Sequence, residues 1–134
     1  MNQADYLLNN RGRLVGVIDG PPGTMTSREG DQACVIRVRV EEKVFDRNGK
    51  LRNANRKFTV AFVSPLADWV FEHAKPEANI SIVLRFEMYS RDRHRSELRL
   101  VGEGLEIEAD GEKKAAKLDV SEDTAVLKEE APDY

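Results

Sequence analysis

The feature that most constrains the fold of this chain is a regular alternation of side chains between Asn79 and Tyr89. Every second position there is large and apolar: Ile80, Ile82, Leu84, Phe86 and Met88. Successive side chains of a β-strand point to opposite faces, whereas a helix would need a repeat of 3.6 residues. The pattern therefore predicts a strand with one buried face.

Similar alternation predicts four more strands, and Leu105 and Ile107 extend the last of them. Their ranges are Arg13–Ile18, Ala33–Val40, Lys57–Val63 and Glu97–Val101. The first strand stops at a run of prolines and glycines that cannot continue a ladder, and Thr24–Asp31 is polar loop. Asn48-Gly49 is a strong reversal signal between the second and third strands.

One helix is predicted between the third and fourth strands. Ser64 is a suitable N-cap, and the proline that follows it is at home in the first turn of a helix. Leu66, Trp69 and Val70 then follow helical spacing, and Pro76 ends the segment.

Three strands, one helix and two strands is the element order of the OB-fold. We therefore expect an all-β domain with one helix over residues 11–109: a five-stranded Greek-key barrel whose helix lies between strands 3 and 4. Residues 1–10 are predicted to be an N-terminal extension. From Asp110 the composition is that of a solvated chain, which predicts a flexible, disordered acidic C-terminal tail over residues 110–134.

Charge divides the chain at the end of the predicted barrel. Residues 11–102 carry seventeen Lys and Arg against twelve Asp and Glu, a net of +5. Residues 103–134 carry four against eleven, a net of −7, so the overall value of −3 conceals both halves. A basic β-rich body with an acidic end is typical of a domain that binds a polyanion and keeps a separate arm for proteins.

Composition argues against several other classes of protein. There is one cysteine, Cys34, so we expect no intrachain disulfide, and a buried, inert thiol at this apolar position. No apolar run approaches the length of a membrane span, and the N-terminus does not read as a secretory signal. Metal-ligand, nucleotide-cradling and nucleophile–base motifs are missing from the sequence, so we expect no metal, no cofactor and no enzymatic activity, in a cytoplasmic protein.

Five segments, in their order and spacing, resemble the single-stranded DNA-binding protein family of bacteria and their phages and plasmids. They are Arg11–Gly16 (RGRLVG), Ala33–Val38 (ACVIRV), Asp46–Lys50 (DRNGK), Val60–Asp68 (VAFVSPLAD) and Ile80–Leu84 (ISIVL). The resemblance implies an OB-fold that assembles as a homodimer or homotetramer and coats single strands with little sequence preference. It also implies a prokaryotic cell or a phage-infected host. Where family members commonly carry tryptophans, this chain has Phe45, Phe58 and Tyr89.

Single strands are bound by a basic groove that follows the phosphates and by aromatic side chains on which bases stack. The outward faces of the predicted strands and the two loops that flank them supply both types. Our candidate nucleic-acid-binding residues are Arg37, Arg39, Phe45, Lys50, Arg52, Lys57, Arg85, Tyr89, Arg91 and Arg93.

Each of these assignments has a structural alternative. Outward arginines on strands are often only solvated, and Phe45 could instead anchor its loop to the core. Phe58, Phe62 and Phe86 lie on apolar faces and are expected in the core. Trp69 is expected to serve packing or a subunit interface rather than base contact.

The end of the tail is a candidate partner-binding segment, formed by Pro132, Asp133 and Tyr134. An aromatic side chain beside a carboxylate can be bound by a pocket that carries an arginine, and the resemblance implies partners among replication and repair proteins. Two alternatives stay open: the acidic end only improves solubility, or it folds over the basic groove of its own chain.

Our leading hypothesis is a non-catalytic protein that coats single-stranded DNA, or RNA, in replication, recombination or repair. The alternative is an OB-fold adaptor, similar to primosomal replication proteins, that acts mainly through protein contacts.

Overall fold

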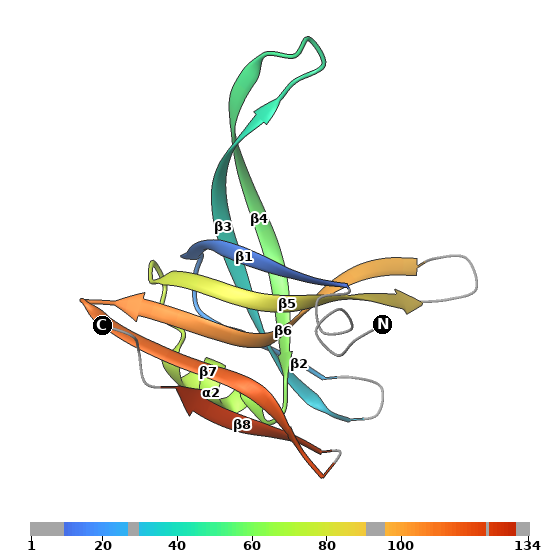
Figure 1. Cartoon of the computed structure of the whole chain (residues 1–134), viewed down its shortest axis with the longest axis vertical. Helices are drawn as coiled ribbons and strands as arrows, with labels where there is room; N and C mark the ends of the chain where they lie inside the picture. Colours follow the sequence, from blue (N-terminus) through green and yellow to red (C-terminus); the bar gives the residue numbers. More distant parts are fainter. Residues whose placement is uncertain (1–9, 27–29, 91–95, 123, 131–134) are drawn as a thin grey trace.

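The computed structural model describes residues 10–26, 30–90, 96–122 and 124–130. Within these ranges the chain forms eight strands and one helix (Figure 1). In chain order they are β1 (Arg11–Ile18), β2 (Gly23–Thr26), β3 (Gln32–Phe45), β4 (Leu51–Val63), α2 (Leu66–His73), β5 (Asn79–Ser90), β6 (Ser96–Ala109), β7 (Glu112–Ser121) and β8 (Thr124–Glu130).

Five of these strands close into a barrel. β1 pairs antiparallel with β3 and with β5, β3 pairs with β4, and β5 pairs with β6. The circle is completed by a short parallel contact between β4 and β6, where Val60 lies opposite Leu100 and Ala61 opposite Val101. Helix α2 lies between the third and fourth barrel strands in sequence. The predicted all-β barrel with one helix is therefore confirmed.

The inward faces of the predicted strands fill the barrel. Its largest fully buried side chains include Ile18, Ile36, Val38, Val60, Phe62 and Ile82, and α2 adds Leu66 and Val70. The core position of Phe62 is thus confirmed, and Cys34 is buried as expected. A Cβ at Gly102 would lie 2.1 Å from the Phe62 ring, so the absence of a side chain on β6 makes room for this ring.

Helix α2 begins differently from the prediction. Its N-cap is Pro65, and no side chain caps the free amides, so the assignment of Ser64 as the cap is wrong. The buried stripe of Leu66, Trp69 and Val70 is as predicted, and it faces the barrel. Packing of the apolar stripe, rather than a capping hydrogen bond, therefore stabilises this short helix.

The chain continues beyond the predicted barrel as a hairpin. β7 pairs antiparallel with β6, and β8 pairs with β7, so the prediction of a disordered segment from Asp110 is wrong for residues 112–121 and 124–130. The sequence shows no clear apolar alternation in β7, because its buried residues are small and stand among charged ones. Ala115 and Ala116 are 6% and 2% exposed. Leu118 and Leu127 also pack against the core. Residues 131–134 lie outside the described residues.

This hairpin lies beside α2 at the end of the molecule opposite the β3–β4 hairpin (Figure 1). Trp69 is only 5% exposed, and its Nε1 donates a hydrogen bond of 3.0 Å to Glu129 Oε1 on β8. Its ring also stacks on His73, with centroids 4.2 Å apart. Packing rather than an exposed aromatic surface is therefore the role of Trp69, as the sequence suggested.

Candidate nucleic-acid interface

The β3–β4 hairpin extends beyond the barrel as a two-stranded ribbon (Figure 1). Residues directly opposite each other in an antiparallel pair point to the same side, so the register assigns each face. Arg39 lies opposite Lys57, and Phe45 lies opposite Leu51. We call this side the ribbon face, and its members are Arg37, Arg39, Glu41, Lys43 and Phe45 on β3 with Leu51, Asn53, Asn55, Lys57 and Thr59 on β4.

A tight turn fixes the tip of the ribbon. Both oxygens of the Asp46 carboxylate are used: Oδ1 accepts the N–H groups of Asn48 and Lys50 at 2.9 Å, and Oδ2 accepts Arg52 Nε at 2.5 Å. These bonds, that from Arg52 first, hold the pKa of Asp46 below its ordinary value. Gly49 has a φ of +75°, which side chains rarely adopt, so the Asn-Gly reversal is realised as predicted.

The turn leaves the tip side chains in solvent. Phe45 is 74% exposed, so it does not anchor the loop to the core. Arg47 and Lys50 are also exposed and form no ion pair with another described residue. An exposed aromatic ring beside unneutralised cations is the combination that single strands require.

The foot of the ribbon is different, because its cations already have acidic partners. Arg39 Nη1 lies 3.1 Å from Asp19 Oδ1, and Arg39 Nη2 lies 2.9 Å from Glu77 Oε2. Lys57 Nζ lies 3.2 Å from Asp19 Oδ2. The pKa of Arg39 is raised, chiefly by its hydrogen bond to Glu77, and the pKa of Asp19 is lowered, chiefly by Lys57.

Three other predicted residues, Arg37, Arg52 and Arg85, differ in where they lie relative to the ribbon. Arg37 is exposed on the ribbon face, whereas Arg52, opposite Val44, lies on the other side of the ribbon near its tip and is paired with Asp46. Arg85 is not brought to it: Arg85 lies on β5, paired through Nη1 with Glu87 Oε2 at 2.6 Å. Arg85 lies opposite Arg11 on β1, whereas Arg39 lies opposite Val17. Arg11 and Val17 are six residues apart, which is about 20 Å along a strand.

The structure does not place the side chains of the remaining predicted residues. Tyr89 is near the end of β5, opposite Glu97, and only its backbone is described. Arg91 and Arg93 lie outside the described residues, as do Pro132, Asp133 and Tyr134. Their predicted roles stay predictions.

Sequence reasoning missed an exposed apolar surface on the β5–β6 arm. Phe86 is 45% exposed, Met88 66% and Leu98 61%, and Met88 lies directly opposite Leu98. The assignment of Phe86 to the core is wrong, because β5 is longer than the barrel and its apolar alternation continues past the barrel wall. Phe58 is half-buried. The length of the alternating segment 79–89 could have indicated that its end extends past the barrel, since strands of about 5–6 residues are usual.

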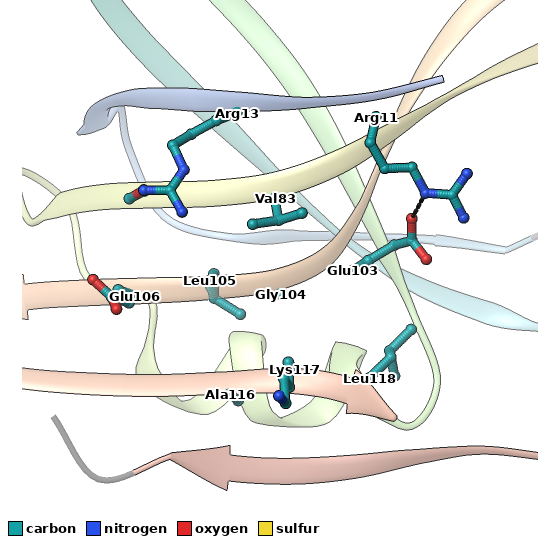
Figure 2. A pocket seen from close by; sticks show the side chains of 11 residues that line it. Arg11, Arg13, Val83, Glu103, Gly104, Leu105, Glu106, Ala116, Lys117 and Leu118 are labelled. Carbon is teal, nitrogen blue, oxygen red and sulfur yellow. Dashed lines mark ion pairs between the residues drawn. The ribbon is translucent and has the colours of Figure 1, made fainter. Parts of the chain in front are cut away.

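A cavity of about 310 Å³ on the outer surface of β1, β5, β6 and β7 was also not predicted (Figure 2). Arg11 and Arg13 line one side, with Arg11 Nε paired to Glu103 Oε1 at 2.8 Å. Val83 and Leu105 contribute apolar surface. Because β7 forms one wall, the cavity could not be inferred while residues 112–121 were expected to be disordered.

No protein-family model matches the sequence, and neither does any curated protein. Solved structures, however, share its architecture. The single-stranded DNA-binding protein of Thermus aquaticus superposes with a TM-score of 0.61 at 15% identity, over 81% of this chain and 55% of that one. At these levels of identity the likeness establishes the fold. The chain has the OB-fold.

Two further OB-fold structures agree. Plasmodium falciparum SSB, solved in complex with ssDNA, gives a TM-score of 0.52 at 12% identity, covering 69% of this chain and 84% of that one. The mitochondrial single-stranded DNA-binding protein of S. cerevisiae gives 0.55 at 14%, covering 73% and 92%. Separately, no helix among the described residues is long and apolar enough to cross a membrane.

Proposed function

We propose that this chain is a non-catalytic protein that binds single-stranded DNA with little sequence preference. The observation that carries the proposal is the tip of the ribbon, where Phe45 is exposed near Lys43 on β3 and near Arg47 and Lys50 in the turn. The DNA-bound Plasmodium falciparum protein, which has the same fold, supports it. Bases stacking on Phe45 would contribute about 1–3 kcal/mol each and would read almost no sequence.

The free cations of the ribbon would hold the phosphates. Arg37, Lys43, Arg47 and Lys50 are exposed and form no ion pair with another described residue. Each phosphate that they neutralise releases counterions, and for single strands each contributes about 0.7 to the slope of log affinity against log salt. Four contacts would therefore give a slope of about −3.

The test is a fluorescence-anisotropy titration of labelled oligothymidine, about 16 nucleotides long, at several salt concentrations. We expect submicromolar binding at low salt, a slope near the stated value, and weaker binding to a duplex of the same length. An oligouridine measures the preference between DNA and RNA. Binding that is absent at low salt, or independent of salt, would refute the proposal.

A second function is favoured by the pairing at the foot of the ribbon. Because Asp19 and Glu77 already neutralise Arg39, and Asp19 also pairs with Lys57, affinity for nucleic acid could be low enough for the chain to act as an adaptor. In that case feeble, length-independent binding accompanies firm binding to a replication protein.

We propose the cytoplasm as the location, a dimer or tetramer as the assembly, and Pro132–Tyr134 as the segment that contacts such partners.

A further inference from the structure

Two cations of neighbouring strands converge on one carboxylate at the foot of the ribbon face. Asp19 Oδ1 lies 3.1 Å from Arg39 Nη1, and Asp19 Oδ2 lies 3.2 Å from Lys57 Nζ. Glu77 meets the other guanidinium nitrogen at 2.9 Å. Like charges placed directly opposite each other on a β-ladder repel, so an anion beside Arg39 and Lys57 is stabilising.

The backbone holds both carboxylates in place. The Asp19 N–H donates to the carbonyl of Arg37 at 2.8 Å, and the Glu77 N–H donates to the carbonyl of Ile18 at 2.8 Å. Glu77 has a φ of +70°, a conformation that non-glycine residues seldom adopt. These bonds fix the main chain at Asp19 and Glu77 beside Arg39, so both acidic side chains start from positions within reach of the guanidinium.

A phosphate could take the position of these carboxylates, because arginine and lysine bind both anions through charge-assisted hydrogen bonds of similar length. We propose that Arg39 and Lys57 form a phosphate-binding subsite that Asp19 and Glu77 occupy in the free protein. The inference rests on the proposed function: on β3 the foot lies between Lys43 and Arg37, so a single strand that contacts both passes Arg39 and Lys57 and binds them by displacing the two carboxylates. Asp19 and Glu77 thus limit both affinity and the length of strand covered.

The occupied site also predicts the form of the salt dependence. When a phosphate replaces the carboxylates at this site, the counterions that leave the phosphate are offset by those that the displaced Asp19 and Glu77 carboxylates attract, so the net release is small. Arg39 and Lys57 should then add little to the salt slope of the parent protein. Removing Asp19 should free Lys57 for the strand and leave Arg39 paired with Glu77 alone, so that less of the counterion release is offset.

The direct experiment compares Asp19→Asn with the parent in the oligothymidine titration. We expect affinity at low salt to rise by about 2- to 5-fold for each ion pair released. The salt slope should steepen by about 0.7 to 1.4, for one or two additional phosphate contacts. Adding Lys57→Gln to Asp19→Asn should reverse most of the gain, because Lys57 is the cation that Asp19→Asn frees.

Glu41→Gln is the matched control. Glu41 is exposed on the same side of β3, two residues from Arg39, and forms no ion pair with another described residue. Its substitution removes one negative charge from the same surface, so it should raise affinity slightly with no change in slope. Equal effects of Asp19→Asn and Glu41→Gln on affinity and slope would show that net charge alone is responsible and would overturn the inference.

Folding is checked by circular dichroism. If Asp19→Asn is unfolded, Glu77→Gln carries the test instead. The Glu77 side chain is 66% exposed, and its ion pair is with Arg39, so its substitution should disturb the fold less. A folded Glu77→Gln protein with parental affinity and slope would then refute the inference. Failure of the parent itself to bind oligothymidine is a different result, since it refutes the proposed function.

Discussion

The substitution Phe45→Ala isolates the contribution of base stacking at the tip of the ribbon. Phe45 is 74% exposed, so about a quarter of its surface is covered in the free protein. Full burial of such a side chain is worth up to about 3 kcal/mol, so truncation should lower the free energy of unfolding by at most about 0.8 kcal/mol. Loss of one stacked base should cost about 1–3 kcal/mol of binding, which raises the dissociation constant about 5- to 150-fold.

The assay is the oligothymidine titration at several salt concentrations, with chemical denaturation as the measure of stability. Stacking involves no phosphate, so the salt slope of Phe45→Ala should equal that of the parent. Lys43→Ala, two residues earlier on the same face, is the control of opposite character: its slope should become shallower by about 0.7. Phe45→Trp should retain binding and show quenching of tryptophan fluorescence by oligothymidine.

Two results would refute the reasoning. Parental affinity in Phe45→Ala would mean that no base stacks at the tip. A change of slope equal to that of Lys43→Ala would mean that the ring positions the cations of the ribbon instead of contacting bases.

Three further predictions concern the barrel and its C-terminal hairpin. Gly102→Ala should lower the free energy of unfolding by about 1–3 kcal/mol or more in urea denaturation, because the new methyl group would lie 2.1 Å from the Phe62 ring; parental stability would show that β6 shifts freely. Glu129→Ala should move the emission of Trp69, the single tryptophan, to longer wavelength, because it removes the acceptor of the indole N–H on β8 and lets water reach the buried ring; an unchanged spectrum would show that β8 does not contact the helix in solution. Burial raises the pKa of the Cys34 thiol from 9.0 to about 11, so the unfolded chain loses its thiol proton first and stability should fall as pH rises through this interval. Measured unfolding free energies between pH 8 and 11 check this, and Cys34→Ser should flatten the decline.

The barrel was predictable because its strands carry large apolar side chains at every second position. Residues 33–40 and 79–89 show the pattern most clearly, and the structure places strands at both. β2 gave no comparable signal, because all four of its residues are exposed. β7 was hidden for another reason: alanines at 115 and 116 fill its buried positions, and small side chains contribute little to an apolar pattern.

The residue types of the interface were predictable, but their electrostatic state was not. Alternation places Arg37 and Arg39 on one outward face, and both are there. Their environments nevertheless differ, because Arg39 meets Asp19 and Glu77, which are 20 and 38 positions away in the sequence. Such contacts follow from barrel closure and loop conformation, which a local pattern does not contain.

The length of the ribbon has a consequence for how the protein opens. From Val40 to Phe45, β3 has β4 as its only neighbour among the described strands, whereas the barrel parts of β3 and β4 also pair with β1, β2 and β6. Two-stranded hairpins are marginally stable in water, so the backbone amides of the ribbon should exchange with deuterium long before those of the barrel. A ligand that rests on the ribbon must slow this local exchange, and the extent of protection along the two strands would trace how far it reaches.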